Sequence, residues 1–104
     1  MIITNTDFVP GKEISSILGL VRGNTIQAKH VGKDIMAGFR NFVGGEIKEY
    51  TEMLSEAREI SLKRMEQKAE KLGADAVINV RFMTSSIMGA AAEILAYGTA
   101  VKLK

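Results

Sequence analysis

The sequence is marked first by what it lacks, since it has no cysteine, no tryptophan, one proline and one histidine. The absence of cysteine excludes disulfides, thiolate nucleophiles and thiolate metal sites. No GxSxG, HExxH or GxGxxG pattern occurs, and no glycine-rich loop ends in lysine. The serine residues and His30 show no spacing that links a nucleophile to a base. We therefore expect that the protein is not an enzyme and that it uses no cofactor.

Long apolar runs and an excess of one charge are also missing. The most apolar window, Ile87–Ala96, is short and carries Glu93, so it cannot cross a bilayer. The segment Met1–Gly11 has no basic region and includes Asp7, which argues against a signal peptide. Net charge is +2, and Lys and Arg alternate with Glu, which argues against nucleic-acid binding. The length predicts a single domain, residues 1–104. Because neither a signal peptide nor a membrane span is predicted, we expect a cytoplasmic protein with no membrane partner.

The clearest predicted element is one long helix within Gly44–Asp75. Apolar and small residues recur there every three or four positions and form one stripe. That stripe consists of Ile47, Tyr50, Leu54, Ala57, Ser61, Met65, Ala69 and Leu72. Gly44-Gly45 breaks the chain before the helix, and Gly73 supplies the left-handed residue that ends it. Acidic residues crowd the first half and basic residues the second, as the helix dipole favours.

The chain before this helix predicts extended structure and a second, shorter helix. Met1–Val9 is extended, and Pro10-Gly11 predicts a turn. Ile14–Gln27 predicts a strand, in which Gly19 and Gly23 indicate a bulge or the close approach of another backbone. Its two sides are Leu18, Leu20 and Arg22 on one and Ile17, Gly19 and Val21 on the other. A hairpin that turns at residues 22–24 is the alternative. Ile35–Val43 has helical spacing and predicts the short helix.

Two strands are predicted after the long helix. Ala76–Thr84 and Glu93–Leu103 alternate with a period of two, and the Ser85–Ala91 loop would join them as an antiparallel pair. Ala76, Ile78, Val80 and Phe82 would share one face, with Val77, Asn79, Arg81 and Met83 on the other. In the last strand Ala96, Gly98 and Ala100 make a bare side, which invites very close packing. The order β, α, α, β, β predicts an α+β fold, a two-layer antiparallel sheet packed by one long helix plus a short helix.

One prediction concerns more than one copy of the chain. Ile17, Val21, Val77 and Met83 would lie on the sheet face opposite the helix stripe. One long helix cannot cover both faces, and exposed apolar patches of this kind mark interfaces. Unless the short helix covers that face, the chain should form a homo-oligomer.

The chain also resembles the YbjQ-like family of small, poorly characterised prokaryotic proteins, which carries the label of heavy-metal binding. The resemblance covers nearly the whole chain and consists of short pieces in a fixed order. These are Pro10-Gly11 with Ile14, Leu18–Gly23, Gly44-Gly45 with Tyr50, Ala57–Glu59, Leu72–Ala76 and Gly98–Val101. It implies a two-layer α+β subunit with a dodecin-like sheet, assembled into a closed ring, as a pentamer.

Four residues are candidates for ligand binding: Gly44, Gly45, Tyr50 and Arg58. A glycine pair before a helix leaves free backbone N–H groups, which favour phosphate or carboxylate. The pair lacks the length and lysine of a phosphate loop, and Glu46 follows it, so a tight turn is the stronger interpretation. Tyr50 is typical of a packing residue with a hydrogen-bonded hydroxyl. Arg58 would pair with a helix carboxylate or with a neighbouring subunit.

The metal label has little support in the residues. Soft heavy metals prefer thiolate or imidazole, and His30 is the single imidazole. A ring could gather one copy of His30 from each subunit, although a solvent-exposed loop histidine is the commoner case. Glu49 and other helix carboxylates could offer oxygen to a hard cation, although a solvated helix face explains them better. His30 and Glu49 are thus only weak metal candidates, and we predict no dedicated metal site.

Together these patterns favour a non-enzymatic homo-oligomeric ring that binds a small ligand or ion at or near subunit boundaries. The alternative is a purely structural or partner-binding ring, and an enzyme is the third reading. A polar pocket near the interface would favour ligand binding, whereas a fully packed interface would favour a scaffold.

Overall fold

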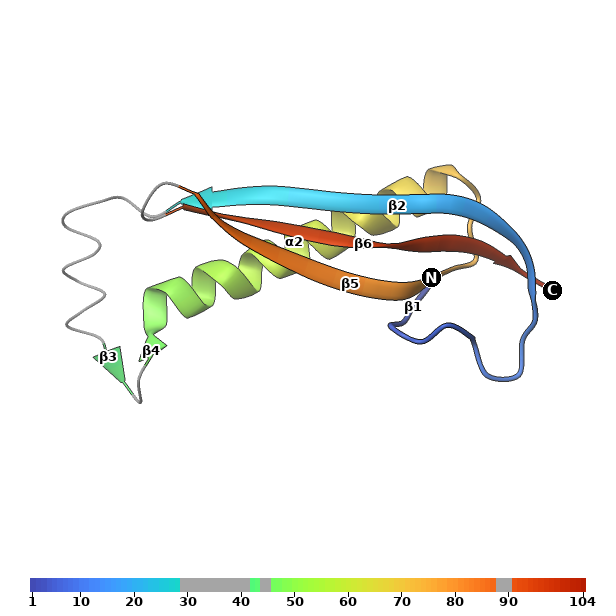
Figure 1. Cartoon of the computed structure of the whole chain (residues 1–104), viewed down its shortest axis with the longest axis horizontal. Helices are drawn as coiled ribbons and strands as arrows, with labels where there is room; N and C mark the ends of the chain where they lie inside the picture. The colour runs from blue at the N-terminus through green and yellow to red at the C-terminus, as the bar shows by residue number, and fades with distance from the viewer. Residues whose placement is uncertain (29–41, 44–45, 88–90) are drawn as a thin grey trace.

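The computed structural model describes residues 1–28, 42–43, 46–87 and 91–104. It forms an elongated α+β unit of 53 × 25 × 16 Å. In chain order the elements are β1 (Ile2–Ile3), β2 (Ile14–Ala28), β3 (Phe42–Val43), β4 (Glu46–Ile47), α2 (Lys48–Lys71), β5 (Ala76–Ile87) and β6 (Ala91–Leu103). The long strands lie in front of the single described helix in Figure 1, and both chain ends lie at the same end of the sheet.

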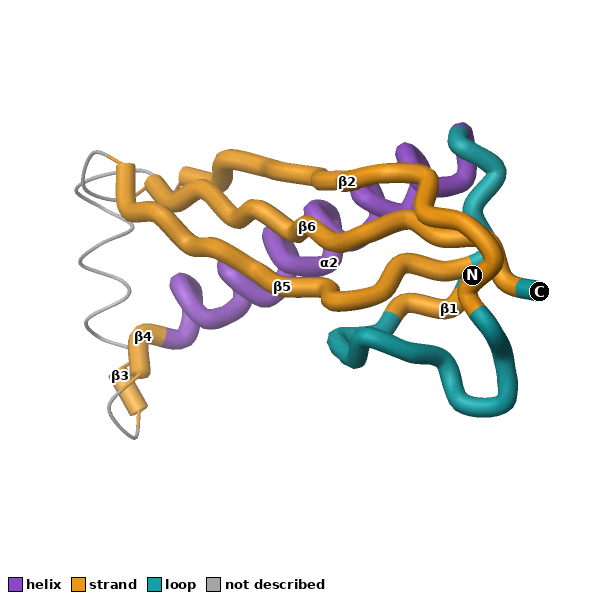
Figure 2. The backbone as a smooth tube through the Cα atoms, turned by 45° about the vertical axis from the view of Figure 1, so that its right-hand side comes forward, coloured by secondary structure: helices purple, strands orange, loops and turns teal. Residues whose placement is uncertain are grey.

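The main sheet has the order β1-β5-β6-β2. The β2–β6 and β5–β6 pairs are antiparallel, as the predicted hairpin requires, but β1 lies parallel to β5. The sheet is therefore mixed, and the prediction of a purely antiparallel sheet was wrong. The reason is that the short N-terminal strand β1 lies along the outer edge of β5, and a loop then leads the chain to β2 on the opposite edge of the sheet (Figure 2).

The region before the long helix differs from the sequence prediction. Phe42–Val43, expected to end a short helix, instead pairs with Glu46–Ile47 as the two-stranded β3–β4. The long helix accordingly begins at Lys48. The rest of the predicted short helix, residues 35–41, lies outside the described residues.

Helix α2 ends where the sequence indicates. Gly73 has φ of +77°. Its N–H bonds to the Glu70 carbonyl at 2.9 Å, and the Ala74 N–H bonds to the Ala69 carbonyl at 3.1 Å. This pair of bonds is the Schellman arrangement, which satisfies carbonyls that the helix would otherwise leave unpaired. The stop signal at Gly73 is confirmed.

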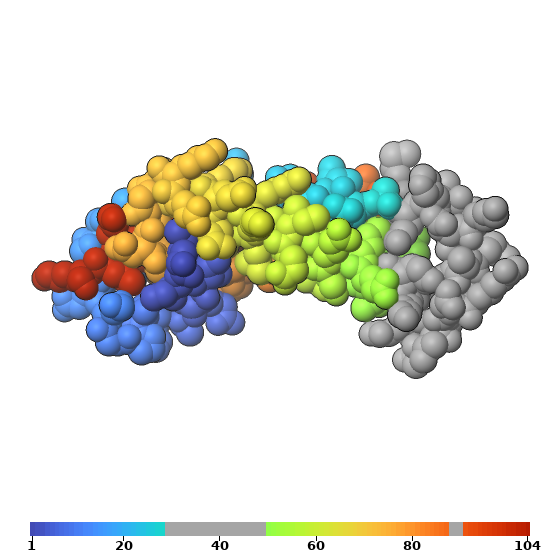
Figure 3. Space-filling view, turned by 180° about the vertical axis from the view of Figure 1, so that it is seen from behind, coloured from blue at the N-terminus to red at the C-terminus, as the bar shows by residue number. Residues whose placement is uncertain are grey.

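The buried stripe of α2 is narrower than predicted. Its members recur every four residues and are Met53, Ala57, Ser61, Met65 and Ala69. Leu72, which was predicted to belong, is 49% exposed because the helix ends beside it. The helix slants behind the strands in Figure 1, and its residues cover the middle of the face that is seen from behind in Figure 3. Met65 and Ala69 there join Val21, Val77, Val80, Ala96 and Ala100 in the main core.

Small residues in the sheet allow the helix to approach closely. A Cβ atom on Gly23 would overlap the backbone of Ser61, Arg64 and Met65. Ala96 and Ala100 are fully buried in the same core. The predictions of close approach at Gly23 and over the bare side of the last strand are therefore confirmed, and the alternative hairpin at residues 22–24 is wrong, since β2 runs through it.

Bulges in the sheet change which residues share a face. The β2–β6 register shifts between Ile17 and Gly19, where Gly19 has φ of +132°. Leu18 packs against the main core and Ile17 is 70% exposed, as predicted, but beyond the bulge the faces are reversed: Val21 is buried in the core and Leu20 is exposed. The β5–β6 register shifts between Ile78 and Arg81, where Asn79 has φ of +54°. Val77 and Val80 therefore share the core face instead of opposite faces.

The sheet face away from α2 is partly covered by the N-terminal segment. Val9 packs there with Ala76, Ile78 and Val101 in a second cluster. Beyond that end, the face carries exposed apolar side chains, and no other described element crosses it (Figure 1). Val21 and Val77, predicted to lie on this face, belong to the core beneath the helix. Ile17 and Met83 do remain exposed.

Candidate functional site

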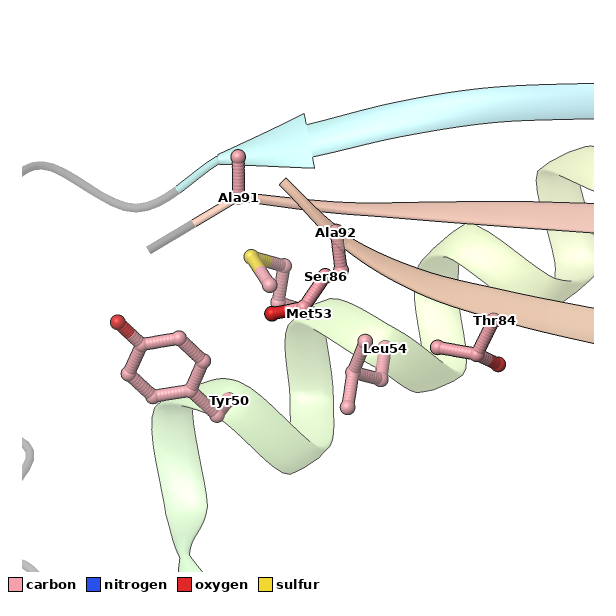
Figure 4. A pocket seen from close by; sticks show the side chains of 7 residues that line it. All are labelled: Tyr50, Met53, Leu54, Thr84, Ser86, Ala91 and Ala92. Atoms are coloured by element: carbon pink, nitrogen blue, oxygen red, sulfur yellow. The ribbon is translucent and has the colours of Figure 1, made fainter. Parts of the chain in front are cut away.

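A pocket opens between the first turns of α2 and the far end of the β5–β6 hairpin (Figure 4). Its volume is about 210 Å³. The lining consists of Tyr50, Met53, Leu54, Thr84, Ser86, Ala91 and Ala92. Helix spacing explains the first wall, since Tyr50, Met53 and Leu54 occupy positions i, i+3 and i+4 on one side of α2. Strand alternation explains the second, since Thr84 and Ser86 point to the same face of β5.

The lining is apolar with a few hydroxyl groups. In Figure 4 the Ser86 hydroxyl points into the space beside Met53, whereas Thr84 turns its hydroxyl away. The Tyr50 ring forms the outer wall. No carboxylate, ammonium or guanidinium group is among the residues that line it. Such a pocket suits a small neutral molecule that is mostly apolar and can hydrogen-bond at one end.

The pocket size limits the ligand. A dry cavity of about 150 Å³ is large enough to hold benzene. The present pocket is somewhat larger and has one wall open to the surface. A single aromatic or aliphatic ring with a small polar substituent would therefore fill it.

Of the sequence candidates, the structure places one at this pocket. Tyr50 is half-buried and forms part of the lining. Arg58 is exposed, lies about two helical turns further along α2 and does not reach the pocket. The described ion pairs join Lys102 to Asp75 and Lys104 to Glu13, so the expected pairing of Arg58 with a helix carboxylate is not among them.

The other candidates lie wholly or partly outside the described part of the chain. Gly44, Gly45 and His30 lie outside the described residues. Glu49 belongs to α2, but its side chain lies outside the described part. Met53, Leu54 and the hairpin residues were not predicted as lining. No local pattern signalled them, because the lining comes from segments that are thirty or more residues apart.

The sequence matches one protein family along its whole length. The family described as "Putative heavy-metal-binding", with the model name YbjQ, matches residues 1–104. The chain belongs to this family. A UPF0145 protein of Methanosarcina acetivorans is 66% identical over 103 residues, which cover 99% of this chain and 97% of the relative. A UPF0145 protein of Archaeoglobus fulgidus is 64% identical over 104 residues, which cover 100% and 96%. The predicted YbjQ resemblance is confirmed.

A solved structure supports the fold of this YbjQ-family chain. The crystal structure of a protein of unknown function from Pediococcus pentosaceus, of the DUF74 family, superposes with a TM-score of 0.65. The match covers 100% of this chain and 98% of the other at 18% identity, so it bears on the fold alone.

The donor set of this YbjQ-family chain does not fit the heavy metal of the family description. Heavy metals favour thiolate and imidazole ligands, and the sequence has no cysteine and one histidine. Within the described ranges, no group of three or more His, Cys, Asp or Glu side chains lies close enough to hold an ion. Nor is any helix in those ranges both long and apolar enough to span a membrane.

Proposed function

We propose that this chain is the subunit of a homo-oligomeric ring, a pentamer, that binds a small neutral ligand without catalysing its conversion. The observation that carries the oligomer is the uncovered sheet face. Ile17, Leu20, Ile26 and Met83 on that face are 70%, 67%, 59% and 54% exposed, respectively. Leaving several large apolar side chains in water costs about 1.5–3 kcal/mol each relative to burial, so a second copy that covers them would bind favourably.

The pocket of Figure 4 supports the ligand-binding half of the proposal. Its uncharged lining excludes strong selection for an anion or a metal ion, and its volume fits one small ring. The pocket lies on the helix side of the sheet, opposite the uncovered face, and Thr84 and Ser86 of its lining belong to β5 at the edge of the sheet. A neighbouring copy at that edge would border a bound ligand.

Native mass spectrometry of protein purified from cells tests both halves together, because it reports the subunit number and the mass of any retained ligand. We expect a single closed oligomer with a retained small mass. Leu20→Lys should shift the distribution toward monomer, because it buries a charge in the contact. Leu72→Lys is the matched control, since Leu72 is also exposed but lies at the end of α2, away from this face.

The pocket can be tested with phenol and indole as probes, by chemical-shift changes in two-dimensional NMR spectra. Saturable shifts that Ala92→Leu removes would support the pocket, because leucine would fill the space. A monomer at micromolar concentration would overturn the ring. An oligomer that retains no mass and binds neither probe would favour a purely structural or partner-binding ring instead.

A further inference from the structure

The second half of β5 is exposed on both of its faces. Its first half is buried apart from the bulge at Asn79, but every residue from Arg81 to Ser86 is exposed. Phe82 and Met83, which point to opposite faces, are 44% and 54% exposed. A strand paired on one side only and covered on neither face gains little from burial. This half of β5 therefore needs a partner that the described part of the subunit does not supply.

The outer edge of β5 is occupied only along its first half. β1 pairs with Ala76 and Val77. The N-terminal segment then continues, with the Thr6 carbonyl accepting from the Asn79 N–H at 2.9 Å and the Thr4 carbonyl accepting from the Val80 N–H at 3.0 Å. From Phe82 to Ile87 no described segment borders this edge, and the sequence FMTSSI contains no charged residue and no proline. Natural edge strands are usually blunted by such residues.

The opposite edge of the sheet is formed by β2, which is also long. β2 has 15 residues and one charged residue, Arg22. After its bulges it runs in regular register with β6 from Leu20 to Ala28. One carbonyl of this stretch, that of Asn24, accepts a hydrogen bond from Arg64 Nη1 at 2.7 Å. The backbone groups two positions away on each side, at Arg22 and Ile26, point in the same direction, and no described backbone group outside the sheet pairs with them.

The two edges are related by direction. β2 and β5 both run antiparallel to β6, so they run parallel to each other within one sheet. A second copy related by rotation about an axis along the strands would thus place its β2 parallel to the first copy's β5. Such a head-to-tail contact uses two different surfaces and, if the rotation closes, generates a ring. Pairing β5 with β5 would instead leave every β2 edge open.

We propose that the subunits join by parallel pairing of the Leu20–Ala28 stretch of one copy with Phe82–Ile87 of the next. The joint rests on the homo-oligomer proposed above and names the surfaces that form it. The neighbouring strand begins where the N-terminal segment leaves the edge of β5. Because Thr84 and Ser86 belong to the paired stretch and line the pocket, the neighbouring copy borders the ligand site.

Engineered disulfides test this joint cleanly because the chain has no cysteine of its own. Met83→Cys is combined in turn with Leu20→Cys, Arg22→Cys, Asn24→Cys and Ile26→Cys, which all project from the open face of β2. Residues facing each other on adjacent strands lie about 5 Å apart, within the range that a disulfide spans. We expect one pair, or two successive pairs, to give a ladder of linked species up to the full ring on mild oxidation. Native mass spectrometry of the reduced proteins is recorded in parallel.

Two sets of controls make the result specific. The single-cysteine variants should give no ladder, because identical residues do not meet in a head-to-tail joint. Phe82→Cys, combined with the same β2 partners, should also fail, because Phe82 is adjacent to Met83 but projects from the other face. An oligomer without any ladder, or efficient dimers from Met83→Cys alone, would overturn the joint while leaving the ring in place. A monomer in the parallel native spectrum would overturn both.

Discussion

Gly23 of β2 lies directly against the backbone of Ser61 in α2, with no room for a side chain between them. Ser61 is itself fully buried, and its Oγ donates a hydrogen bond to the Ile94 carbonyl of β6 at 2.9 Å. A glycine in the strand and a serine in the helix thus set the spacing between the two layers. The core and the pocket at the end of the helix depend on that spacing.

Gly23→Ala should destabilise the protein strongly. Its Cβ would overlap helix backbone atoms, which cannot move aside as a flexible side chain could. We expect a loss of about 3 kcal/mol or more, the upper end for an overpacked core, in denaturant unfolding at one fixed protein concentration. Gly11→Ala is the control: nothing lies within 4 Å of its added Cβ, but φ is +75°. That strain alone should cost about 1–2 kcal/mol. Equal losses in the two variants would contradict the close approach.

Ser61→Ala should cost stability for a different reason. The substitution leaves the packing nearly unchanged but removes the hydrogen-bond donor to the Ile94 carbonyl. A buried carbonyl that loses its partner costs about 1–3 kcal/mol. Ser55→Ala in the same helix is exposed and should change the free energy of unfolding by no more than about 0.5 kcal/mol. If the two variants unfold alike, the buried hydrogen bond contributes nothing measurable.

Asn79 should tolerate glycine better than alanine. Its φ of +54° at the β5 bulge lies in the left-handed region, which asparagine and glycine adopt more readily than alanine. The backbone bond from its N–H to the Thr6 carbonyl is kept in both variants. We expect Asn79→Ala to lower the free energy of unfolding by about 1 kcal/mol and Asn79→Gly to leave it nearly unchanged. A larger loss for glycine would show that the side chain, not the backbone conformation, matters there.

The bulges at Gly19 and Asn79 mark the limit of what the sequence could predict about the fold. Local patterns were sufficient for the long helix, its end at Gly73, the β2 strand and the β5–β6 hairpin, because each depends on neighbours within a few residues. The predicted faces of β2 and β5 hold on one side of each bulge and fail on the other, because one inserted residue reverses the alternation. Gly19 indicated a possible bulge in the sequence. Asn79 did not, because asparagine is also common in regular turns and loops.

The candidate site was less predictable, for a geometric reason. Tyr50 was singled out, but its pocket depends on Thr84 and Ser86, which are more than thirty residues away in sequence. Only the diagonal crossing of α2 and the length of the hairpin bring them together. Serine and alanine near a hairpin tip are common and carry no signal for a ligand. The parallel pairing of β1 with β5 was also not predictable, because β1 has only two residues.

Titration with zinc, copper or calcium should show no saturable binding to the intact protein. Zinc and copper prefer imidazole and thiolate, of which the chain offers only His30, and the described acidic side chains form no cluster that calcium could use. We expect isothermal titration with each of the three metals to give only the heat of dilution, and EDTA to leave the unfolding temperature unchanged. His30→Ala is the informative variant. A saturable heat that it abolishes would mean that the ring gathers imidazoles from several copies, whereas a heat that persists would place the ion on carboxylates. Either result would contradict the prediction and would support metal binding by this chain.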